Sequence, residues 1–346
     1  QSRIPALNEK AQMGLRTNFN EIAFEIVLPV TEQQPLLERV LRSSVNWAYT
    51  NLQGMTFGIL FAAAILAILS NIRRRQFESP CLNSVAGVFI GAPLGVCVNC
   101  ATPIAFGIYS AGARLEPALA SLVASPTLNV IVLTMAFTLL PWEFALAKLV
   151  GVLVFIAMMP LLVRRFAPAP DLRAAAEIAS GGATRLPALE EAPIPPPDEG
   201  ILAALIAVSK QFLGNLWYLV RFALPLMILA GVLGSFVIEL VPFETFAART
   251  AGLGAIAAGG LVAAFLPVPI AFDVIIVMAL LANGVDSGLA MALLFGLGIY
   301  SIYPAAMIAR YVSATLSMAM GVVVVLLAIA LGLAMQSWIG QRTATE

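Results

Sequence analysis

Long apolar stretches separated by short polar segments make up most of this chain. A helix needs about 20 apolar residues to cross the hydrocarbon core of a membrane. Stretches of roughly that length lie at 53–71, 116–140, 142–163, 217–240, 287–309 and 312–338. This pattern predicts an all-α, polytopic membrane protein.

Two further apolar stretches, 84–111 and 253–283, are interrupted by prolines and glycines and contain the same tetrapeptide. The sequence Pro-Ile-Ala-Phe occurs at 103–106 and again at 269–272. Irregular backbone at membrane depth persists only inside protein or beside a water-filled cavity. Matching interruptions in the two halves of a membrane protein indicate a transport site. These two stretches therefore mark the candidate site.

The basic residues predict how the two halves are oriented in the membrane. Positive side chains collect on the cytoplasmic side, and Arg73–Arg75 and Arg164–Arg165 each close a predicted span. Both clusters lie on the cytoplasmic side if residues 84–111 enter the membrane from that side and return to it as a broken hairpin. The same rule makes 253–283 re-entrant from outside and places Arg310 inside. The chain is therefore predicted to contain two inverted repeats, each with about three transmembrane helices plus a broken segment. Eight ordinary crossings in two parallel repeats are the alternative.

The charge and apolar patterns divide the chain into four parts. Residues 1–52 are predicted to form an extracytoplasmic arm with a helix on the membrane surface, and 53–165 form the first repeat. Residues 166–200 are rich in proline and predict a flexible cytoplasmic linker. The second repeat follows at 201–340. Because residue 1 is glutamine, the chain is expected to be processed or to lack upstream residues.

The composition excludes several classes of function. The chain is 60% hydrophobic and 11% charged, and it contains no histidine. Histidine metal ligands, haem ligation through histidine and histidine proton relays are therefore excluded. The net charge is zero, so nucleic acid is not expected as a partner. The sequence has no G-x-x-x-x-G-K-[ST] phosphate-binding loop. We expect neither a cofactor nor an enzymatic activity.

Cys97 and Cys100 form a C-x-x-C pair in the first interrupted stretch. Two thiolates at this spacing can bind one soft ion, such as Cu(I), Zn(II) or trivalent arsenic. They can equally cycle between dithiol and disulfide, or pack as small hydrophobic side chains. The pair is the candidate metal or substrate site. Cys81, which follows the first arginine cluster, is not expected to take part.

Polar side chains beside proline breaks are further candidates for substrate contact. A proline frees backbone carbonyls, which neighbouring polar groups or a ligand can satisfy. Pro126 and Pro304 lie in corresponding apolar elements of the two halves, each among polar side chains. Alternatively, each is a proline kink whose groups bond to one another. The predicted substrate-binding residues are Cys97, Asn99, Cys100, Pro103, Ser125, Thr127, Asn129, Tyr300 and Tyr303.

Asp273 is the acidic residue inside the second interrupted stretch. A carboxylate at membrane depth is unfavourable, so it normally faces a cavity, pairs with a cation or is protonated. Asp273 is therefore the predicted coupling residue, for a proton or another cation. No basic partner is evident at the same depth. Lys148, near the outer end of its helix, is expected to extend to the membrane interface.

The motifs of the first half resemble those of a predicted-permease family that includes the organoarsenical efflux permeases. The resembling segments are Cys97–Cys100, Gly112–Arg114 and Ala124–Asn129. In that family a cysteine motif, often with one residue between the cysteines rather than two, precedes a G-A turn and an A-S-P-x-x-N motif. The resemblance implies a two-repeat permease of the bacterial inner membrane that exports trivalent arsenicals or soft metals.

The leading hypothesis is a secondary transporter that exports a small soft metal or metalloid species by alternating access, with Asp273 coupling protons. One alternative is a membrane thiol–disulfide relay that uses Cys97 and Cys100. Another is a non-transporting membrane subunit of a larger complex. The expected partners are the substrate and the lipid bilayer, with a homo-oligomer or a partner protein at the N-terminal arm as further options.

Overall fold

The computed structural model describes residues 26–31, 33–71, 79–110, 113–167, 201–240 and 252–345, which form helices joined by loops. The first half contains α3 (Leu36–Asn71), α4 (Pro80–Gly91), the short 3-10 helix η1 (Ala92–Leu94), α5 (Val98–Ser110), α6 (Leu115–Thr127), α7 (Val130–Leu139) and α8 (Trp142–Phe166). The second half contains α10 (Ile201–Leu240), α12 (Leu253–Phe265), α13 (Phe272–Ala282), α14 (Ser287–Gly296), α15 (Ile302–Tyr311) and α16 (Ala314–Thr345). Of the predicted linker at 166–200, the part from 168 onward lies outside the described residues.

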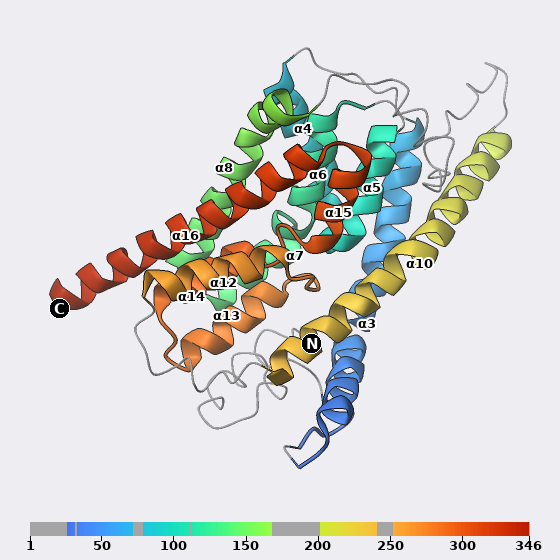
Figure 1. The fold of residues 1–346 in the computed structure, drawn as a ribbon. Helices are drawn as coiled ribbons and strands as arrows, with labels where there is room; N and C mark the ends of the chain where they lie inside the picture. The colour runs from blue at the N-terminus through green and yellow to red at the C-terminus, as the bar shows by residue number, and fades with distance from the viewer. Residues whose placement is uncertain are drawn as a thin grey trace.

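The order of elements in the first half recurs in the second (Figure 1). Each half begins with a long helix, α3 or α10, and ends with another, α8 or α16. Between them lie a pair of short helices joined through a break, α4–α5 or α12–α13, and then a broken helix, α6–α7 or α14–α15. In Figure 1, α4 and α5 lie in the upper part of the molecule, and α12 and α13 lie in the lower part. The helical class predicted from the sequence is confirmed for the described residues.

Two described helices, α8 and α16, are long and apolar enough to cross a membrane. Helices α6 and α7 qualify together as a third span, bent by 43° at their break. Helices α4, α12, α13 and α14 are apolar but shorter. The break after α6 has a clear local cause. Pro126 removes one backbone donor from the last turn of α6, and the Asn129 side chain caps α7 by accepting a hydrogen bond from the Val132 amide (2.9 Å).

The helix predicted on the membrane surface and the first predicted span form one continuous helix, α3, of 36 residues. At about 1.5 Å per residue, such a helix is longer than the roughly 30 Å of hydrocarbon in a bilayer. Near its start, the Asn46 side chain binds the preceding segment, accepting from the Leu28 amide (2.8 Å) and donating to the Leu28 carbonyl (2.8 Å). The N-terminal turns of α3 are therefore tied to the chain that precedes them.

Small residues let several helices approach closely, as is typical where the surroundings supply no hydrophobic driving force. Gly231 of α10 faces the indole of Trp47 on α3, and a Cβ there would come within 2.3 Å of the ring. Gly87 and Gly91 of α4 lie equally close to the backbone of α6. In the second half, Gly332 of α16 lies against the backbone of α14. These contacts fix the packing that surrounds the interrupted segments.

We expect Gly91→Ala to destabilise the protein by about 1–3 kcal/mol, because overpacking forces backbone shifts. A Cβ at Gly91 would lie 2.3 Å from the carbonyl oxygen of Ser121, and backbone atoms cannot rotate away. The measurement is the thermal unfolding midpoint of the purified protein in detergent. Gly254→Ala in α12 is the matched control, since no atom lies within 4 Å of its added Cβ. Equal midpoints for the two variants would show that the α4–α6 contact is looser than described.

The two copies of Pro-Ile-Ala-Phe have different conformations. The first copy lies inside α5, which begins at Val98. The second forms a loop that leads into α13, with Ala271 at a φ of 61° before the helix begins at Phe272. Pro269 corresponds to Pro103, but Pro267 has no counterpart in the first copy, where Ala101 stands. The two prolines together disfavour helical backbone at Leu266 and Val268. Ala271 is the non-glycine residue with positive φ among the described residues, so this loop holds local backbone strain.

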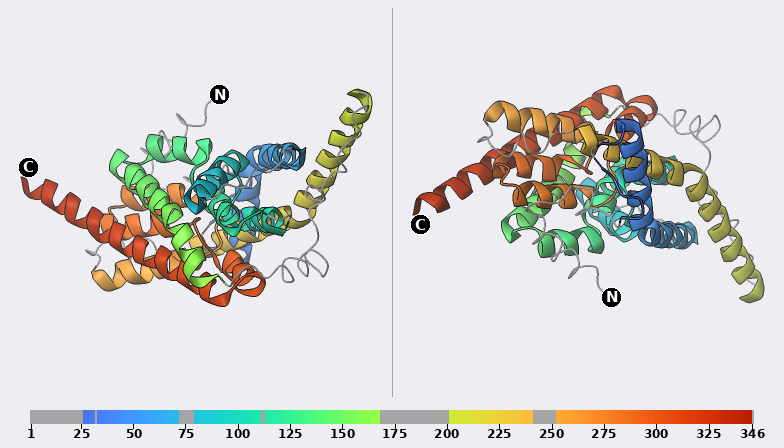
Figure 2. Two further views of the ribbon diagram at one scale, coloured as in Figure 1. Left: turned by 90° about the horizontal axis from the view of Figure 1, so that it is seen from above. Right: turned by 90° about the horizontal axis from the view of Figure 1, so that it is seen from below.

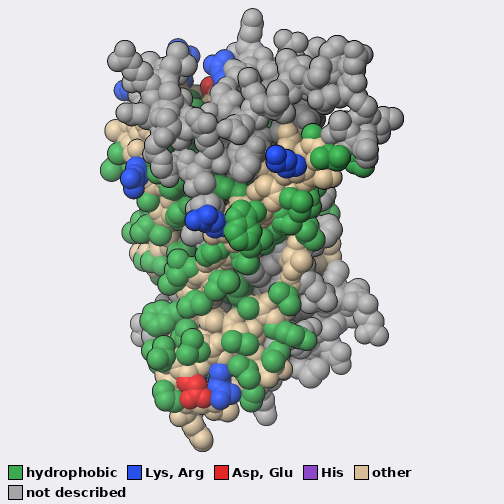
Figure 3. Space-filling view, turned by 90° about the vertical axis from the view of Figure 1, so that its right-hand side faces the viewer, with side chains coloured by type: hydrophobic (Ala, Val, Ile, Leu, Met, Phe, Trp, Pro, Cys, Tyr) green, Lys and Arg blue, Asp and Glu red, His purple; other side chains and the backbone are tan. Residues whose placement is uncertain are grey.

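Basic residues from both halves lie at one end of the molecule. The side chains of Ser313 and Thr315, before and within the first turn of α16, both donate hydrogen bonds to the Phe166 carbonyl (3.1 and 3.2 Å). This brings the end of α8, with Arg164 and Arg165, beside the end of α15, which carries Arg310. Figure 3 shows most Lys and Arg side chains of one face in its upper half, with hydrophobic side chains below them and a further basic side chain beside an acidic one near the lower end. The positive-inside rule predicts that Arg164, Arg165 and Arg310 lie on the same side of the membrane.

The two halves meet through the long helices α3 and α10, which pack against each other, and through their interrupted segments. Helix α5 of the first half contacts α15 of the second, and α7 of the first half contacts α13 of the second. Helix α8 also packs against α14 and α16. The two views in Figure 2 show the N-terminal part of α10 and the C-terminal part of α16 extending away from this central region. The interrupted segments therefore lie where the halves join.

Candidate functional site

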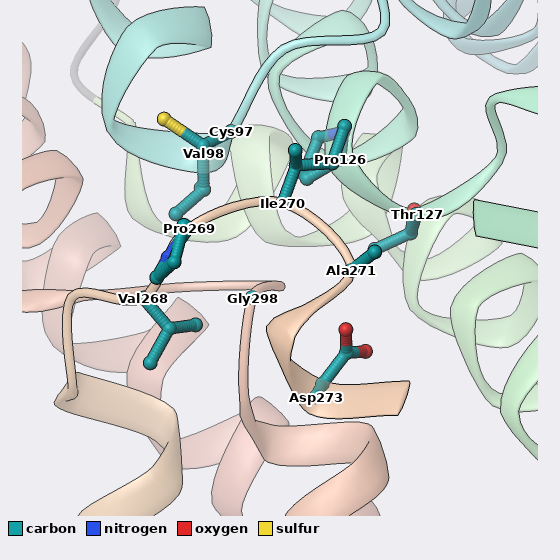
Figure 4. A pocket seen from close by; sticks show the side chains of 10 residues that line it. All are labelled: Cys97, Val98, Pro126, Thr127, Val268, Pro269, Ile270, Ala271, Asp273 and Gly298. Carbon is teal, nitrogen blue, oxygen red and sulfur yellow. The ribbon is translucent and has the colours of Figure 1, made fainter. Parts of the chain in front are cut away.

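A narrow pocket lies between the halves, where four helix ends meet (Figure 4). Its lining comes from the starts of α5 and α13, the end of α6 and the segment after α14. The lining residues are Cys97, Val98, Pro126, Thr127, Val268, Pro269, Ile270, Ala271, Asp273 and Gly298. The space between them is too narrow to hold a water-sized sphere. The structure therefore shows this pocket closed.

Cys97 and Cys100 lie at the first turn of α5. The carbonyl of Cys97 accepts hydrogen bonds from the amides of Cys100 (3.0 Å) and Ala101 (2.8 Å), which start the helix. Both cysteines are buried and free, and their thiols hydrogen-bond to each other. Two adjacent thiols at a helix start can bind one soft ion or metalloid together, and they can also form a disulfide. Cys81, in contrast, is exposed.

The thiol of Cys97 and the carboxylate of Asp273 lie on opposite sides of a loop. In Figure 4, the segment from Val268 to Ala271 arches between them, and the Cys97 sulfur points away from Asp273. This loop contains the second Pro-Ile-Ala-Phe copy and the strained backbone of Ala271. The two chemically distinct groups of the pocket therefore do not touch, and the loop separates them.

Asp273 forms a buried ion pair with Lys148 of α8. The expectation that Lys148 extends to the membrane interface is wrong, because Lys148 is 3% exposed and Asp273 is 4% exposed. Asp273 lies in the first turn of α13, where the helix dipole also stabilises its negative charge. A buried charge is tolerated when it is paired. The pair ties the first half of the chain to the second.

A second polar contact between the halves lies beside the cysteines. Ser301, which precedes α15, donates a hydrogen bond to the side-chain oxygen of Asn99 in α5 (2.6 Å), and both residues are buried. Asn99 was predicted to contact substrate, but in this conformation it binds the other half of the protein. Ser301 is one of the polar residues beside the Pro304 break, but it was not among the predicted substrate-binding residues.

Ser125 and Asn129 stabilise the break between α6 and α7. The Ser125 hydroxyl contacts both the amide and the carbonyl of Val96 (3.2 Å each), which holds the loop before Cys97 in place. The Asn129 side chain donates to the Ser125 carbonyl (2.8 Å). Thr127 lines the pocket, although its hydroxyl donates to the Val123 carbonyl (2.6 Å). Of these three predicted residues, the structure brings only Thr127 to the pocket.

The predicted tyrosines and Pro103 lie around the pocket rather than in its lining. The Tyr300 hydroxyl is bound to Ser317 (2.9 Å), and the Tyr300 ring packs edge-on against Phe265. Tyr303 is half-buried. Pro103 belongs to α5, so its missing N–H leaves the Asn99 carbonyl without the usual helical donor. The side chain of Pro103 lies outside the described part of the structure.

The contacts that Lys148 and Ser301 make between the halves were not predicted from the sequence. Lys148 is spaced in register with the buried residues Phe144 and Val152 of α8, but α8 is apolar on all sides, so the spacing did not reveal its inner face. Ser301 directly precedes a helix, a position where serine is common as a cap. Among the described residues, no group of three or more Cys, Asp or Glu side chains is arranged to hold a metal ion. A soft ion at Cys97 and Cys100 would therefore have two protein thiols as its ligands.

The sequence model of the predicted permease family ArsP_1 matches residues 39–337, which is most of the chain. No curated protein matches the chain. No solved structure matches it either.

Proposed function

The chain belongs to the predicted permease family ArsP_1, and we propose that it exports a small soft metal or metalloid species, such as a trivalent arsenical, by alternating access. Family membership and the apolar spans indicate a multi-pass membrane protein and a permease rather than an enzyme. The proposed location is the bacterial inner membrane. We propose the identity of the substrate, its transport out of the cell and the coupling of transport to protons.

One observation carries the proposal: a closed, thiol-bearing pocket where broken helices from both halves meet. Transporters place substrates near the membrane midplane, between repeats, at the ends of discontinuous helices. Here the starts of α5 and α13 and the end of α6 line the pocket. Cys97 lines the pocket, and Cys100 follows it in the first turn of α5, so the pair supplies soft sulfur beside this junction. Soft sulfur binds soft ions and trivalent metalloids.

Inverted repeats fit the arrangement of the helices. The short pairs α4–α5 and α12–α13 lie in opposite parts of the molecule in Figure 1. The contacts between the halves are reciprocal, because α5 packs on α15 while α7 packs on α13. Two repeats related by a pseudo-twofold axis would produce both features. In the proposed cycle, the repeats rock about this junction and open the pocket to one side at a time.

We assign coupling to Asp273, which lies across the loop from the thiols. A buried carboxylate in a membrane is a site where a proton or cation can bind and be released. Its separation from Cys97 supports distinct positions for the substrate and for the coupling ion. Asp273 lies in the first turn of the short helix α13 at the pocket, so its movement with α13 would change the lining directly.

Uptake into everted membrane vesicles tests the proposal. Vesicles that contain the protein should accumulate trivalent arsenicals or soft metal ions, and a proton gradient should accelerate the accumulation. Vesicles with a Cys97→Ser/Cys100→Ser variant, present at an equal level, serve as the control. Absence of accumulation for every species tested, with well-inserted protein, would refute the exporter.

A thiol–disulfide relay is the second candidate, because the two thiols are adjacent and hydrogen-bonded. Its difficulty is access, since the exposed fractions are 1% for Cys97 and 0% for Cys100. A relay needs one of these sulfurs to meet a partner's sulfur. A mixed disulfide that accumulates in a Cys100→Ser variant would favour the relay over transport.

A further inference from the structure

We infer that Lys148 sets the charge selectivity of the pocket: by neutralising Asp273, it favours uncharged soft ligands over cations. This inference rests on the proposed function, because it concerns what the same pocket accepts. Lys148 contacts Asp273 and not the thiols of Cys97 and Cys100. Lys148 therefore acts by positioning and neutralising the carboxylate.

The charges around the pocket support this role. Asp273 is the charged residue among those that line the pocket, and Lys148 pairs with it from α8. Helices α7 and α14, which pack against α13, contain no charged residue. The other charged residues of α8 are Glu143 near its start and Arg164 and Arg165 in its last turn. Asp273 and Lys148 thus leave the middle of this region without net charge.

The rest of the pocket lining is mostly apolar, so a charge in the pocket strongly affects which ligands can bind there. Apart from Cys97, Thr127 and Asp273, the lining consists of Val, Ile, Ala, Pro and Gly residues. The Thr127 hydroxyl is already bound to a backbone carbonyl. A cation that enters such a place loses its water and meets few groups to replace it, and this is strongly unfavourable. An uncharged ligand does not lose that hydration energy.

The chemistry of the thiols gives the same preference. An uncharged trivalent metalloid dihydroxide can react with both cysteines. Two S–H bonds and two metalloid–oxygen bonds break, two sulfur–metalloid bonds form, and the protons leave on the two hydroxides as water. No charge is created, and nothing is oxidised or reduced. A monovalent cation that replaces a thiol proton instead releases H⁺. The Asp273 carboxylate is a poor acceptor for this proton, because it is already paired with Lys148.

Removing the lysine charge should therefore convert the pocket into a better cation site. Lys148→Met keeps an unbranched side chain of similar length but leaves the Asp273 carboxylate unpaired. At an effective dielectric constant of about 20, one unpaired charge in a pocket changes the affinity for a cation by about tenfold or more. The affinity for an uncharged ligand should change little.

The experiment measures binding of two probes to purified protein in detergent by titration calorimetry. The probes are Ag⁺, a soft cation, and phenylarsine oxide, an uncharged reagent for paired thiols. All variants carry Cys81→Ser, because Cys81 is an exposed thiol. Lys148→Met should bind Ag⁺ at least about tenfold more tightly and should bind phenylarsine oxide within about threefold of the parent. Lys148→Arg should behave like the parent.

Two further variants make the outcome decisive. Lys148→Met/Asp273→Asn restores a neutral pocket and should return Ag⁺ binding to the parent value. Lys210→Met removes an exposed lysine from α10 and should change neither affinity. An unchanged Ag⁺ affinity in folded Lys148→Met, or a gain that persists in the double variant, would overturn the inference alone. Failure of the parent protein to bind either probe would overturn the proposed function as well.

Discussion

Asp273→Asn is expected to destabilise the protein by about 3–5 kcal/mol, because it leaves the ammonium group of Lys148 buried without a partner. Lys148→Met should have an effect of similar size, since it leaves the carboxylate alone. Lys148→Met/Asp273→Asn should be less destabilised than either single variant, because neither charge then remains. Both side chains are almost fully buried, so solvent does little to reduce these effects.

The measurement is the thermal unfolding midpoint of each variant in the same detergent, together with the fraction that elutes as a monodisperse peak. Lys210→Met is the control for loss of an exposed lysine. A double variant that is as unstable as the sum of the two single variants would contradict the prediction. That result would mean that the two side chains contribute independently, through packing, rather than as an ion pair.

The same double variant separates stability from coupling. If Asp273 carries the coupling proton, folded Lys148→Met/Asp273→Asn protein retains its thiols and binds substrate but no longer responds to a proton gradient. The single variant Asp273→Asn cannot show this alone, because misfolding would give the same loss.

The sequence predicted the helical class and the location of the pocket because both depend on strong local signals. Apolar length reveals membrane helices, and proline and glycine reveal the breaks in 84–111 and 253–283. Cys97 and Asp273 were found because sulfur and a carboxylate are conspicuous in apolar stretches. The structure places both beside one pocket.

The contacts that the sequence did not reveal depend on packing between distant segments. Asn99 and Ser301 are 202 positions apart, and Lys148 and Asp273 are 125 apart. Nothing local indicates which polar side chain meets which. A lysine two turns inside an apolar helix is compatible both with extension to the interface and with a buried pair.

The identical tetrapeptides have different conformations in the two halves. The first Pro-Ile-Ala-Phe copy is helical because α5 has already begun at Val98. The second copy follows Pro267, which has no counterpart before the first copy, and Pro267 and Pro269 together disfavour helical backbone at Leu266 and Val268. The copies therefore do not play equivalent roles: one continues the helix that starts at the thiols, and the other forms the loop between the thiols and the carboxylate.

Cys97→Ser is expected to lower export of a soft metal or metalloid by at least tenfold, with little loss of folded protein. Changing groups that merely support a metal ligand already lowers affinity by roughly 10–100-fold, so removal of a ligand should have at least that effect. Serine has nearly the shape of cysteine, and the carbonyl that starts α5 belongs to the backbone. The local fold should therefore persist.

The measurement is the initial rate of uptake into everted vesicles, corrected for the amount of inserted protein. Cys81→Ser removes an exposed thiol outside the pocket and should transport at the parental rate. Cys100→Ser should resemble Cys97→Ser, because two sulfur atoms hold the substrate together. Parental transport by Cys97→Ser/Cys100→Ser would remove sulfur from the mechanism. The closed pocket would then have to select its substrate by size and charge, which leaves the loop from Val268 to Ala271 and the Lys148–Asp273 pair as its determinants.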